Sequence, residues 1–447
     1  MFSSFFELMF LVLLVVVSVN LGWWISIWVC VMISSVVIIM EYTSIGISSC
    51  SCDGVFISDE VSCGMVWLSV FISSLSLLGS NEILVKKDKE TSFPVCVLVL
   101  MGILMVFFLA NSLLVFYIFF EFSLIPIFLI ICGWGYQPER LRAGKFMVLY
   151  TVGASLPLLA FVLCLVFMKG SVSLSFFNSC GEVTENFFMF LMAIMAFLVK
   201  IPVYGLHMWL PKAHVEAPVA GSMMLAGVLL KLGGYGLVRF MPFFSMCDTV
   251  IFSCVICLCI FGGATGSVIC CFQTDVKSLV AYSSVGHMSL VLCGLMSGKL
   301  LGLAGAYLLM VAHGLSSPGM FYLVGEMYKL FGSRSLFVIR GMLGNLLGIN
   351  LWLAFMCGFN AAAPPSLSIC GEVVLYISTM SYSLLFSIFL GAMSFLSCLY
   401  SWLLYCSTQT GNYPVWTRSS GDVTCFYFQS IVCGSLSFFL ISLCVMV

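Results

Sequence analysis

The chain has 447 residues, of which 62% are hydrophobic and only 8% are charged, against about 25% charged residues in an ordinary soluble domain. This composition excludes a water-soluble enzyme. With 17 Lys and Arg against 18 Asp and Glu, the net charge is -1, and no basic block offers the charge that phosphate backbones attract, which excludes a nucleic-acid partner. The composition predicts a helical membrane protein.

A membrane-spanning helix needs about 20 apolar residues, and the hydropathy predicts about fourteen such segments. In chain order they are 2–19, 22–40, 61–79, 92–109, 112–132, 146–168, 187–209, 217–239, 249–271, 278–297, 301–324, 341–378, 383–405 and 425–446. The polar stretches 41–60 and 406–424 are too short to form a soluble domain. The predicted fold class is therefore all-α, a polytopic membrane protein with a single membrane domain over residues 1–447.

Two of these segments contain prolines that should interrupt a helix, because proline lacks the backbone N–H and clashes with the preceding turn. Segment 187–209 has Pro202, followed by Pro211, and the long segment 341–378 has Pro364 and Pro365. We read both as broken helices. Two broken helices in corresponding places predict an inverted repeat of about five helices, as in transporters that bind at the midplane.

Lys and Arg fall mainly in alternate loops, which sets the expected orientation because basic loops stay on the side of synthesis. The loops after the odd-numbered segments hold twelve: Lys86, Lys87, Lys89, Arg140, Arg142, Lys145, Lys212, Lys277, Lys329, Arg334, Arg340 and Arg418. The other side holds only Lys169, Arg239 and Lys299. Both chain ends are expected on the side that is poor in positive charge.

The 22 cysteines lie mostly inside apolar runs, where a free thiol behaves as a small hydrophobic residue. We therefore expect no metal site in the chain. Residues with G- and T-rich codons are abundant, and Met1 leads directly into an apolar run without the basic start of a cleavable signal. Both features favour a protein encoded in an organelle genome.

Ionisable residues inside the predicted spans are the strongest functional signal. A charge at the bilayer centre costs at least about 2.5–3.5 kcal/mol and persists only where it is paired or hydrated. Five such residues lie on different segments: Glu121, Lys200, Lys231, His313 and Glu372. Burial favours the neutral forms of carboxylates and amines, so such groups can exchange protons. They predict a proton relay, whereas an isolated Glu121–Lys200 ion pair could equally serve to lock two helices together.

Three further histidines are weaker candidates. His207 and His214 flank the proline break and could load protons or cap the helix end, while His287 could be an interhelical hydrogen-bond donor. Their spacing does not match a zinc motif.

Several motifs resemble the family of NADH-ubiquinone oxidoreductase chain 4, the antiporter-like membrane subunits of respiratory complex I. They are KIPVYGLHMWLPKAHVEAP at 200–218, KLGGYG at 231–236, GWG at 133–135, YSSVGHM at 282–288, AHGL at 312–315, APP at 363–365 and GE at 371–372. The likeness covers about residues 91–380, which it marks as an antiporter-like proton-translocating core between N-terminal helices 1–90 and C-terminal helices 381–447.

The resemblance implies a subunit of an H+-translocating NADH:ubiquinone reductase in the mitochondrial inner membrane, acting in respiratory electron transport. It implies that Glu121 and Lys200 form a coupling pair, that Lys231 is the central proton carrier, that His313 is the next relay and that Glu372 ends the path. NADH, FMN, iron-sulfur clusters and ubiquinone would be used by other subunits, and this chain would hold no cofactor. Its partners would be the other membrane subunits, neighbouring antiporter-like subunits included, and membrane lipid.

Two other functions remain open. A multi-subunit cation/proton antiporter would share Lys200, Lys231 and the broken helices, and sodium transport would distinguish it. A passive structural membrane subunit would keep the fold, with its buried charges merely paired. Pumping that survives neutralisation of Lys231 would favour this last reading.

Overall fold

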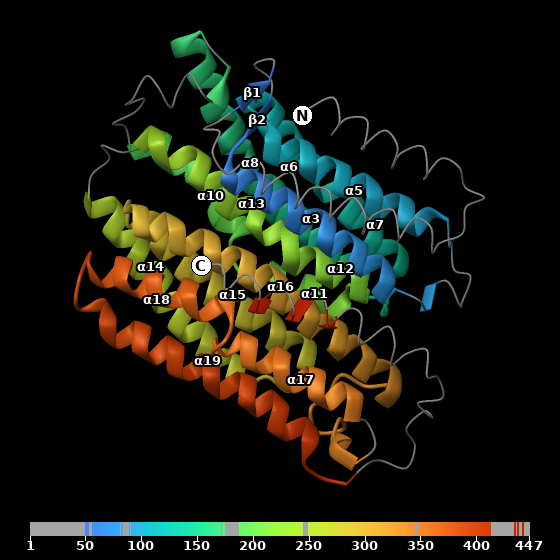
Figure 1. Ribbon diagram of the computed structural model, residues 1–447. Coiled ribbons are helices and arrows are strands. Elements are labelled where there is room, and N and C mark those ends of the chain that lie inside the picture. The colour runs from blue at the N-terminus through green and yellow to red at the C-terminus, as the bar shows by residue number, and fades with distance from the viewer. Residues whose placement is uncertain are drawn as a thin grey trace.

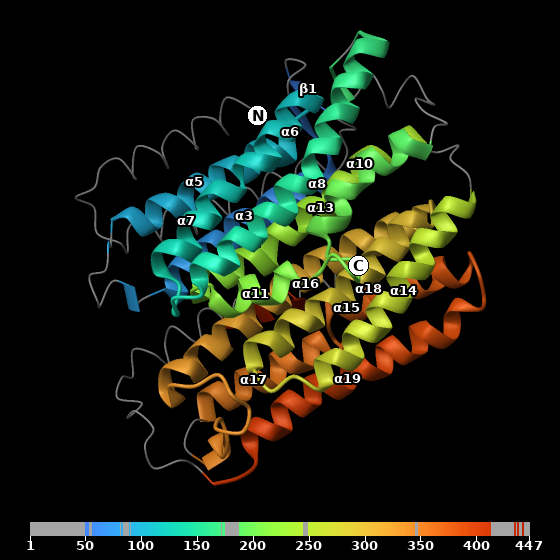
Figure 2. The same cartoon turned by 180° about the vertical axis from the view of Figure 1, so that it is seen from behind.

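The computed structural model describes residues 50–52, 56–80, 91–170, 187–244, 249–344 and 347–412, together with 82–83, 89, 172–174, 433–434, 436–437 and 440–441. Its helices run side by side in one bundle (Figures 1 and 2). The predicted segments 2–19 and 22–40, and most of 425–446, lie outside the described residues. A short antiparallel hairpin, β1 (Cys50–Cys52) with β2 (Phe56–Ser58), precedes the first described helix.

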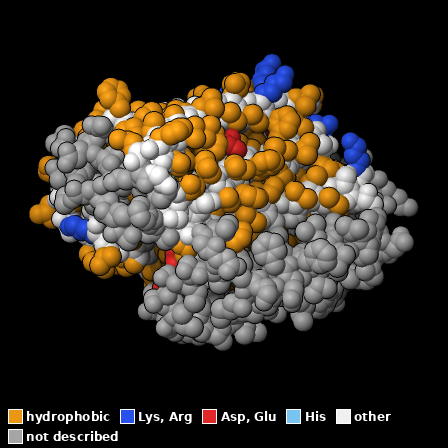
Figure 3. All heavy atoms as spheres, turned by 90° about the horizontal axis from the view of Figure 1, so that it is seen from above, with side chains coloured by type: hydrophobic (Ala, Val, Ile, Leu, Met, Phe, Trp, Pro, Cys, Tyr) orange, Lys and Arg blue, Asp and Glu red, His pale blue; other side chains and the backbone are white. Residues whose placement is uncertain are grey.

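Nine apolar helices long enough to cross a membrane lie among the described residues, and each matches one predicted segment. They are α3 (Glu60–Gly79), α5 (Ser92–Leu109), α6 with α7 (Leu113–Phe122 and Leu124–Trp134), α8 (Arg140–Lys169), α12 with α13 (Val219–Met224 and Leu230–Phe240), α14 (Thr249–Cys271), α15 (Val276–Met296), α16 (Leu300–Phe331) and α19 (Phe386–Gln409). The all-helical, multi-pass architecture is thereby confirmed. Apolar side chains cover most of the described part of the face seen in Figure 3, with Lys and Arg at its margins.

Both predicted broken helices are present, but Pro211, expected to interrupt the first of them, lies instead in the first turn of its second half, where the missing N–H costs no hydrogen bond. Helix α10 (Phe187–Lys200) stops before Pro202, turns follow, and the chain resumes as α11 (Trp209–Glu216). Helix α17 (Leu347–Asn360) ends before the Pro364–Pro365 pair, after which α18 (Leu367–Met380) begins. In each case proline withholds the N–H that would continue the helix.

Two irregularities were not predicted, since both segments had been taken as uninterrupted helices. The span from α12 to α13 contains a π-helical turn, Leu225–Leu229, that ends two residues before Lys231. The predicted segment 112–132 divides at Ser123 into α6 and α7, two residues after Glu121. π-helical turns inside α-helices are frequent at functional sites, because they displace carbonyls from the regular ladder.

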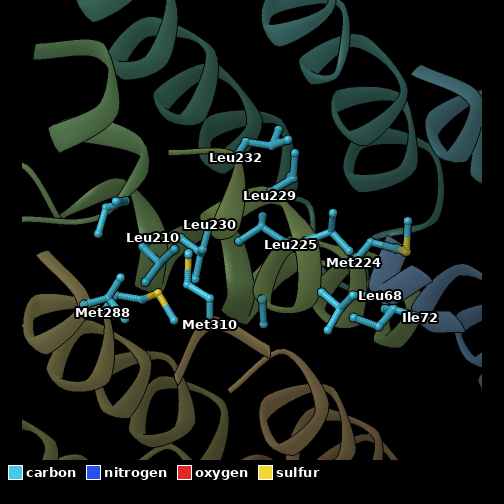
Figure 4. Packing of buried hydrophobic residues seen from close by; sticks show 14 of the residues in the cluster. Leu68, Ile72, Leu210, Met224, Leu225, Leu229, Leu230, Leu232, Met288 and Met310 are labelled. Carbon is cyan, nitrogen blue, oxygen red and sulfur yellow. The ribbon is translucent and has the colours of Figure 1, made fainter. Parts of the chain in front are cut away.

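The centre of the bundle is packed around the π-helical turn. In Figure 4, side chains of α3 such as Ile72, of α11 such as Leu210, and of α15 and α16 such as Met288 and Met310 converge on Leu225–Leu229. The broken helix α10–α11 is thus held against the helices that follow it in the chain.

The helix ends form two faces. On one, Tyr136 after α7 lies against Lys277 at the start of α15, and Arg334 after α16 bonds the end of α11. On the other, Arg239 near the end of α13 pairs with Asp59 before α3. The first face carries the loops that are rich in Lys and Arg, and we call it the positive-rich face. The alternation expected from the loop charges therefore agrees with the way the described helices pack.

Glycine at position 236 allows α13 to lie close to α10, and its replacement should destabilise the chain. A Cβ there would collide with the ring of Phe197, which is fully buried. We expect Gly236→Ala to cost about 1–3 kcal/mol, the usual penalty for overpacking a core. Thermal unfolding of the whole complex should show the loss. Gly153→Ala is the matched control, because nothing lies within 4 Å of the added atom; an equal effect of both variants would contradict the packing argument.

Candidate functional site

Lys231 lies at the centre of the bundle, in the first turn of α13. Its side chain is 0% exposed. The ammonium donates a hydrogen bond to the carbonyl of Ala226, which belongs to the π-helical turn, and Nζ lies 2.9 Å from Nδ1 of His313 on α16. The π-helical turn thus offers the Ala226 carbonyl as an acceptor, whereas in a regular α-helix each carbonyl already accepts from a backbone N–H.

His313 continues this contact toward the next histidine. Its ring centroid lies 5.7 Å from that of His287 on α15. The hydroxyl of Ser317 donates to the His313 carbonyl at 2.7 Å and lies 3.4 Å from Nδ1. Within the described structure Nε2 of His313 has no hydrogen-bond partner, although it is buried. A buried nitrogen without a hydrogen-bond partner costs free energy unless a water molecule satisfies it.

His287 bridges His313 and the carboxylate of Glu372. Its Nδ1 lies 3.3 Å from Oε1 of Glu372 on α18, and its Nε2 lies 3.3 Å from the hydroxyl of Tyr400 on α19. The hydroxyl of Tyr376 donates to Oε2 of Glu372 at 3.3 Å. His287, Glu372, Tyr376 and Tyr400 line a cavity of about 10 Å³, close to the smallest volume that holds a water molecule.

Glu121 and Lys200 are neighbours but do not touch. Lys200 Nζ donates to the carbonyl of Phe120 at 3.0 Å and lies 3.3 Å from the centroid of the Phe120 ring. The Glu121 carboxylate is near enough to attract the ammonium electrostatically. Among the described side chains, however, the two form no direct ion pair, and Oε1 of Glu121 is buried without a hydrogen-bond partner. The direct pair considered in the sequence analysis is therefore absent from this conformation, because Lys200 reaches the adjacent backbone instead.

Glu121 also lines a groove on the outside of the bundle. The groove has a volume of about 570 Å³ and lies between α6, α7 and α8, with Lys145 at one side and otherwise apolar walls. The carboxylate therefore stands between the buried Lys200 and a surface of the chain.

The two remaining histidines lie on either side of the α11 start. His207, in the break, accepts a hydrogen bond at Nδ1 from the Gly205 amide at 3.2 Å and stacks on Tyr204. His214, on α11, is fully buried and lies flat on the ring of Phe321, with centroids 4.5 Å apart. In the part of the chain that the structure describes, neither ring nitrogen of His214 has a partner.

The sequence reasoning missed three charged residues beside His214. Lys277 and Arg334 had been counted as loop residues, and Glu216 had not been singled out. All three are largely buried, and Arg334 lies 3.4 Å from Glu216. The signal was present for Lys277, since the apolar run of α15 begins before it at Val276.

Six helices of the bundle carry the ionisable groups: Glu121 is on α6, Lys200 on α10, Lys231 on α13, His313 on α16, His287 on α15 and Glu372 on α18. Contacts join Lys231 to His313, and His287 to both His313 and Glu372. Each of these side chains can hold or release a proton, as the groups of proton relays inside membranes do. No cluster of three or more potential metal ligands occurs among the described residues.

Comparison with known proteins identifies the family. Residues 1–107 match the family model "NADH-ubiquinone oxidoreductase chain 4, amino terminus", and residues 110–399 match "NADH:quinone oxidoreductase/Mrp antiporter, TM". The NADH-ubiquinone oxidoreductase chain 4 of Ceratitis capitata is 42% identical over 367 residues, which is 82% of each chain. That of Rhipicephalus sanguineus is 43% identical over 78% of this chain and 79% of its own. The chain belongs to the NADH-ubiquinone oxidoreductase chain 4 family.

It is accordingly a membrane subunit of NADH:ubiquinone oxidoreductase, respiratory complex I, and other subunits of that complex are its partners. A solved structure described as respiratory complex I from Thermus thermophilus with bound NADH contains a chain of the same fold. Its TM-score is 0.84 at 23% identity, over 97% of this chain and 95% of the other. The family predicted from the motifs is therefore confirmed over a larger part of the chain than the motifs cover.

Proposed function

We propose that this chain translocates protons across the membrane, driven by electron transfer from NADH to ubiquinone in other subunits of the complex. The observation that carries the proposal is the buried series from Lys231 to Glu372: Lys231 contacts His313, the rings of His313 and His287 pack with centroids 5.7 Å apart, and His287 contacts Glu372. Helix locking requires only paired charges, whereas among the described residues this set includes a buried His313 nitrogen, Nε2, that has no hydrogen-bond partner. Ionisable chains of this kind inside membranes mark ion or proton pathways.

Each residue has a distinct role in this proposal. Lys231 is the central carrier, His313 receives its proton, and Glu372 ends the path inside the membrane. Glu121 and Lys200 form the coupling pair, whose separation regulates the proton on Lys200. His287, a secondary candidate in the sequence analysis, is given the role of link between His313 and Glu372, and its contacts with both support this.

The complete chain is proposed to form about fourteen transmembrane helices around residues 91–380, with an inverted repeat of about five helices. The two broken helices, α10–α11 and α17–α18, support this repeat, because transporters build midplane sites from such pairs. The helices of 1–90 and 381–447 would flank the core. We place the chain in the mitochondrial inner membrane, next to other antiporter-like subunits, with NADH, FMN, iron-sulfur clusters and ubiquinone bound elsewhere in the complex.

The decisive experiment neutralises Lys231 in the whole complex, reconstituted in vesicles, and measures protons translocated per NADH oxidised. An unchanged ratio would contradict the proposal.

The name of the matching family model also includes Mrp antiporters, so a cation/proton antiporter function is the second candidate. Electrogenic sodium uptake by the same vesicles, persisting when a protonophore collapses the proton gradient, would favour that candidate.

The positive-rich face is expected to lie toward the mitochondrial matrix, because insertion retains Lys and Arg loops on the side of synthesis. An epitope inserted in the 80–91 loop should therefore be inaccessible in organelles with an intact inner membrane and become accessible after permeabilisation. An epitope at Gly298, in the turn on the opposite face between α15 and α16, should be accessible from the intermembrane space. Accessibility of the 80–91 epitope in intact organelles would overturn the proposed orientation.

A further inference from the structure

The half-helix α11 ends inside the protein with carbonyls that its own backbone cannot satisfy. It has eight residues, and Pro218 follows its last turn directly. Because proline has no N–H, and because the chain turns at Ala217, the carbonyls of Val215 and Ala217 need partners from elsewhere. Unsatisfied backbone groups are especially costly in a membrane protein.

Two cations from distant parts of the chain supply these partners. Lys277 Nζ donates to the Ala217 carbonyl at 3.0 Å and to the Val215 carbonyl at 3.4 Å. Arg334 Nη1 donates to the Val215 carbonyl at 2.8 Å. The Lys277 side chain is nearly inaccessible to solvent, and its ammonium lies 4.7 Å from the ring centroid of Tyr136.

The position of Lys277 is itself unusual. It lies in the first turn of α15, where the helix dipole disfavours a positive charge. A backbone bridge between Asp275 and Ser335, with a hydrogen bond of 3.0 Å from the Val276 amide to the Arg334 carbonyl, joins the two cations into one framework. The backbone bridge fixes Lys277 and Arg334 relative to each other, so both can bind the end of α11 from fixed positions.

The loop after α7 closes the same end of α11. A Cβ on Gly135 would lie 2.8 Å from the Glu216 carbonyl oxygen, which is closer than a side chain can approach. The GWG motif at 133–135 thus permits the loop that carries Tyr136 to pack on the end of α11.

His214 depends on this arrangement. It precedes Val215 on α11, and its ring is fixed by packing on Phe321, since within the described structure neither ring nitrogen has a partner. It lies within electrostatic range of both Lys231 and Lys277. Any shift of the α11 end would move this ring relative to Lys231.

We propose that Lys277 is a positioning residue that clamps the end of α11 and so holds His214 beside the central carrier Lys231. This inference rests on the proposed function. The clamp requires a cation with donors aimed at two carbonyls, and it requires no release of the Lys277 proton. In this respect Lys277 differs from the proton carriers of the proposed relay, such as Lys231, which must release a proton.

Four variants in the whole complex test the clamp. Lys277→Met removes the donors, and it should lower the protons translocated per NADH as far as His214→Phe does, with no further loss in the double variant. Lys277→Arg keeps the charge and the donors but cannot release a proton, and it should retain the wild-type ratio. An electron cryo-microscopy structure of the Lys277→Met complex should show the His214 ring displaced from Phe321.

The opposite results are equally clear. An undisplaced ring or a normal ratio in the Lys277→Met complex overturns the clamp, and failure of the Arg variant overturns it in favour of a carrier role. If the Lys277→Met complex does not assemble, Lys277→Gln replaces it; its amide keeps two donors but loses the charge. The proton ratio and the position of the His214 ring are then measured in the Lys277→Gln complex and interpreted in the same way. Normal pumping in a Lys231→Met complex would instead refute the proposed function, while the ring position would still decide the clamp.

Discussion

Lys231→Met is expected to stop most proton transfer through this chain while the complex still assembles. Methionine fills a similar volume, and the main structural cost is the Ala226 carbonyl that loses its donor, about 1–3 kcal/mol for a buried unsatisfied group. Without the carrier, a proton must cross apolar surroundings at a cost of at least about 2.5–3.5 kcal/mol, which slows transfer roughly 100-fold. Protons translocated per NADH should therefore fall, with NADH:quinone reductase activity as the parallel measurement.

Lys231→Arg should fail similarly, because arginine keeps its proton at any physiological pH. The matched control is Lys212→Met, which removes an exposed lysine on α11 that lies over the ring of Phe146. That variant should pump normally. Normal pumping by the Arg variant would eliminate Lys231 as a carrier and leave it a structural cation.

Glu121→Gln is expected to assemble and to pump weakly. A helix lock would predict poor assembly, because breaking a buried ion pair costs about 3–5 kcal/mol. In the structure, however, Lys200 is held by the Phe120 carbonyl and ring, so it keeps these partners when the Glu121 charge is removed. The effect should instead be electrostatic. Two opposite charges about 8 Å apart at an effective dielectric near 20 attract by about 2 kcal/mol, so removing the Glu121 charge should alter the proton occupancy of Lys200 about 30-fold.

The measurement is proton uptake by vesicles that carry the whole complex, together with the amount of assembled complex. Glu139→Gln, at an exposed carboxylate on the positive-rich face, should change neither quantity. Adding Tyr117→Glu to Glu121→Gln returns a carboxylate one helical turn away on α6, and it should partly restore pumping if proximity to Lys200 is what matters. Loss of the assembled complex in Glu121→Gln would support the lock, and unaltered pumping would remove Glu121 from the mechanism.

The sequence by itself determined where the described helices lie. Segments 92–109 and 249–271 coincide with α5 and α14, because the thickness of the bilayer dictates the length of an apolar run. Both proline breaks were predicted for an equally local reason, the missing N–H of proline. The five ionisable residues inside the predicted spans were also evident, since hydropathy alone shows that a charge inside a span is out of place.

The tertiary structure decided which of these groups touch. His287 links His313 to Glu372, and Lys200 binds the Phe120 carbonyl rather than Glu121. Lys277, which the sequence analysis counted as a loop residue, lies in the first turn of α15 and binds the end of α11. Depth along a helix follows from residue number, but the direction of a side chain depends on how each helix is rotated against its neighbours. That rotation is set by packing over residues far apart in the chain, and by irregular turns such as Leu225–Leu229 that hydropathy does not detect.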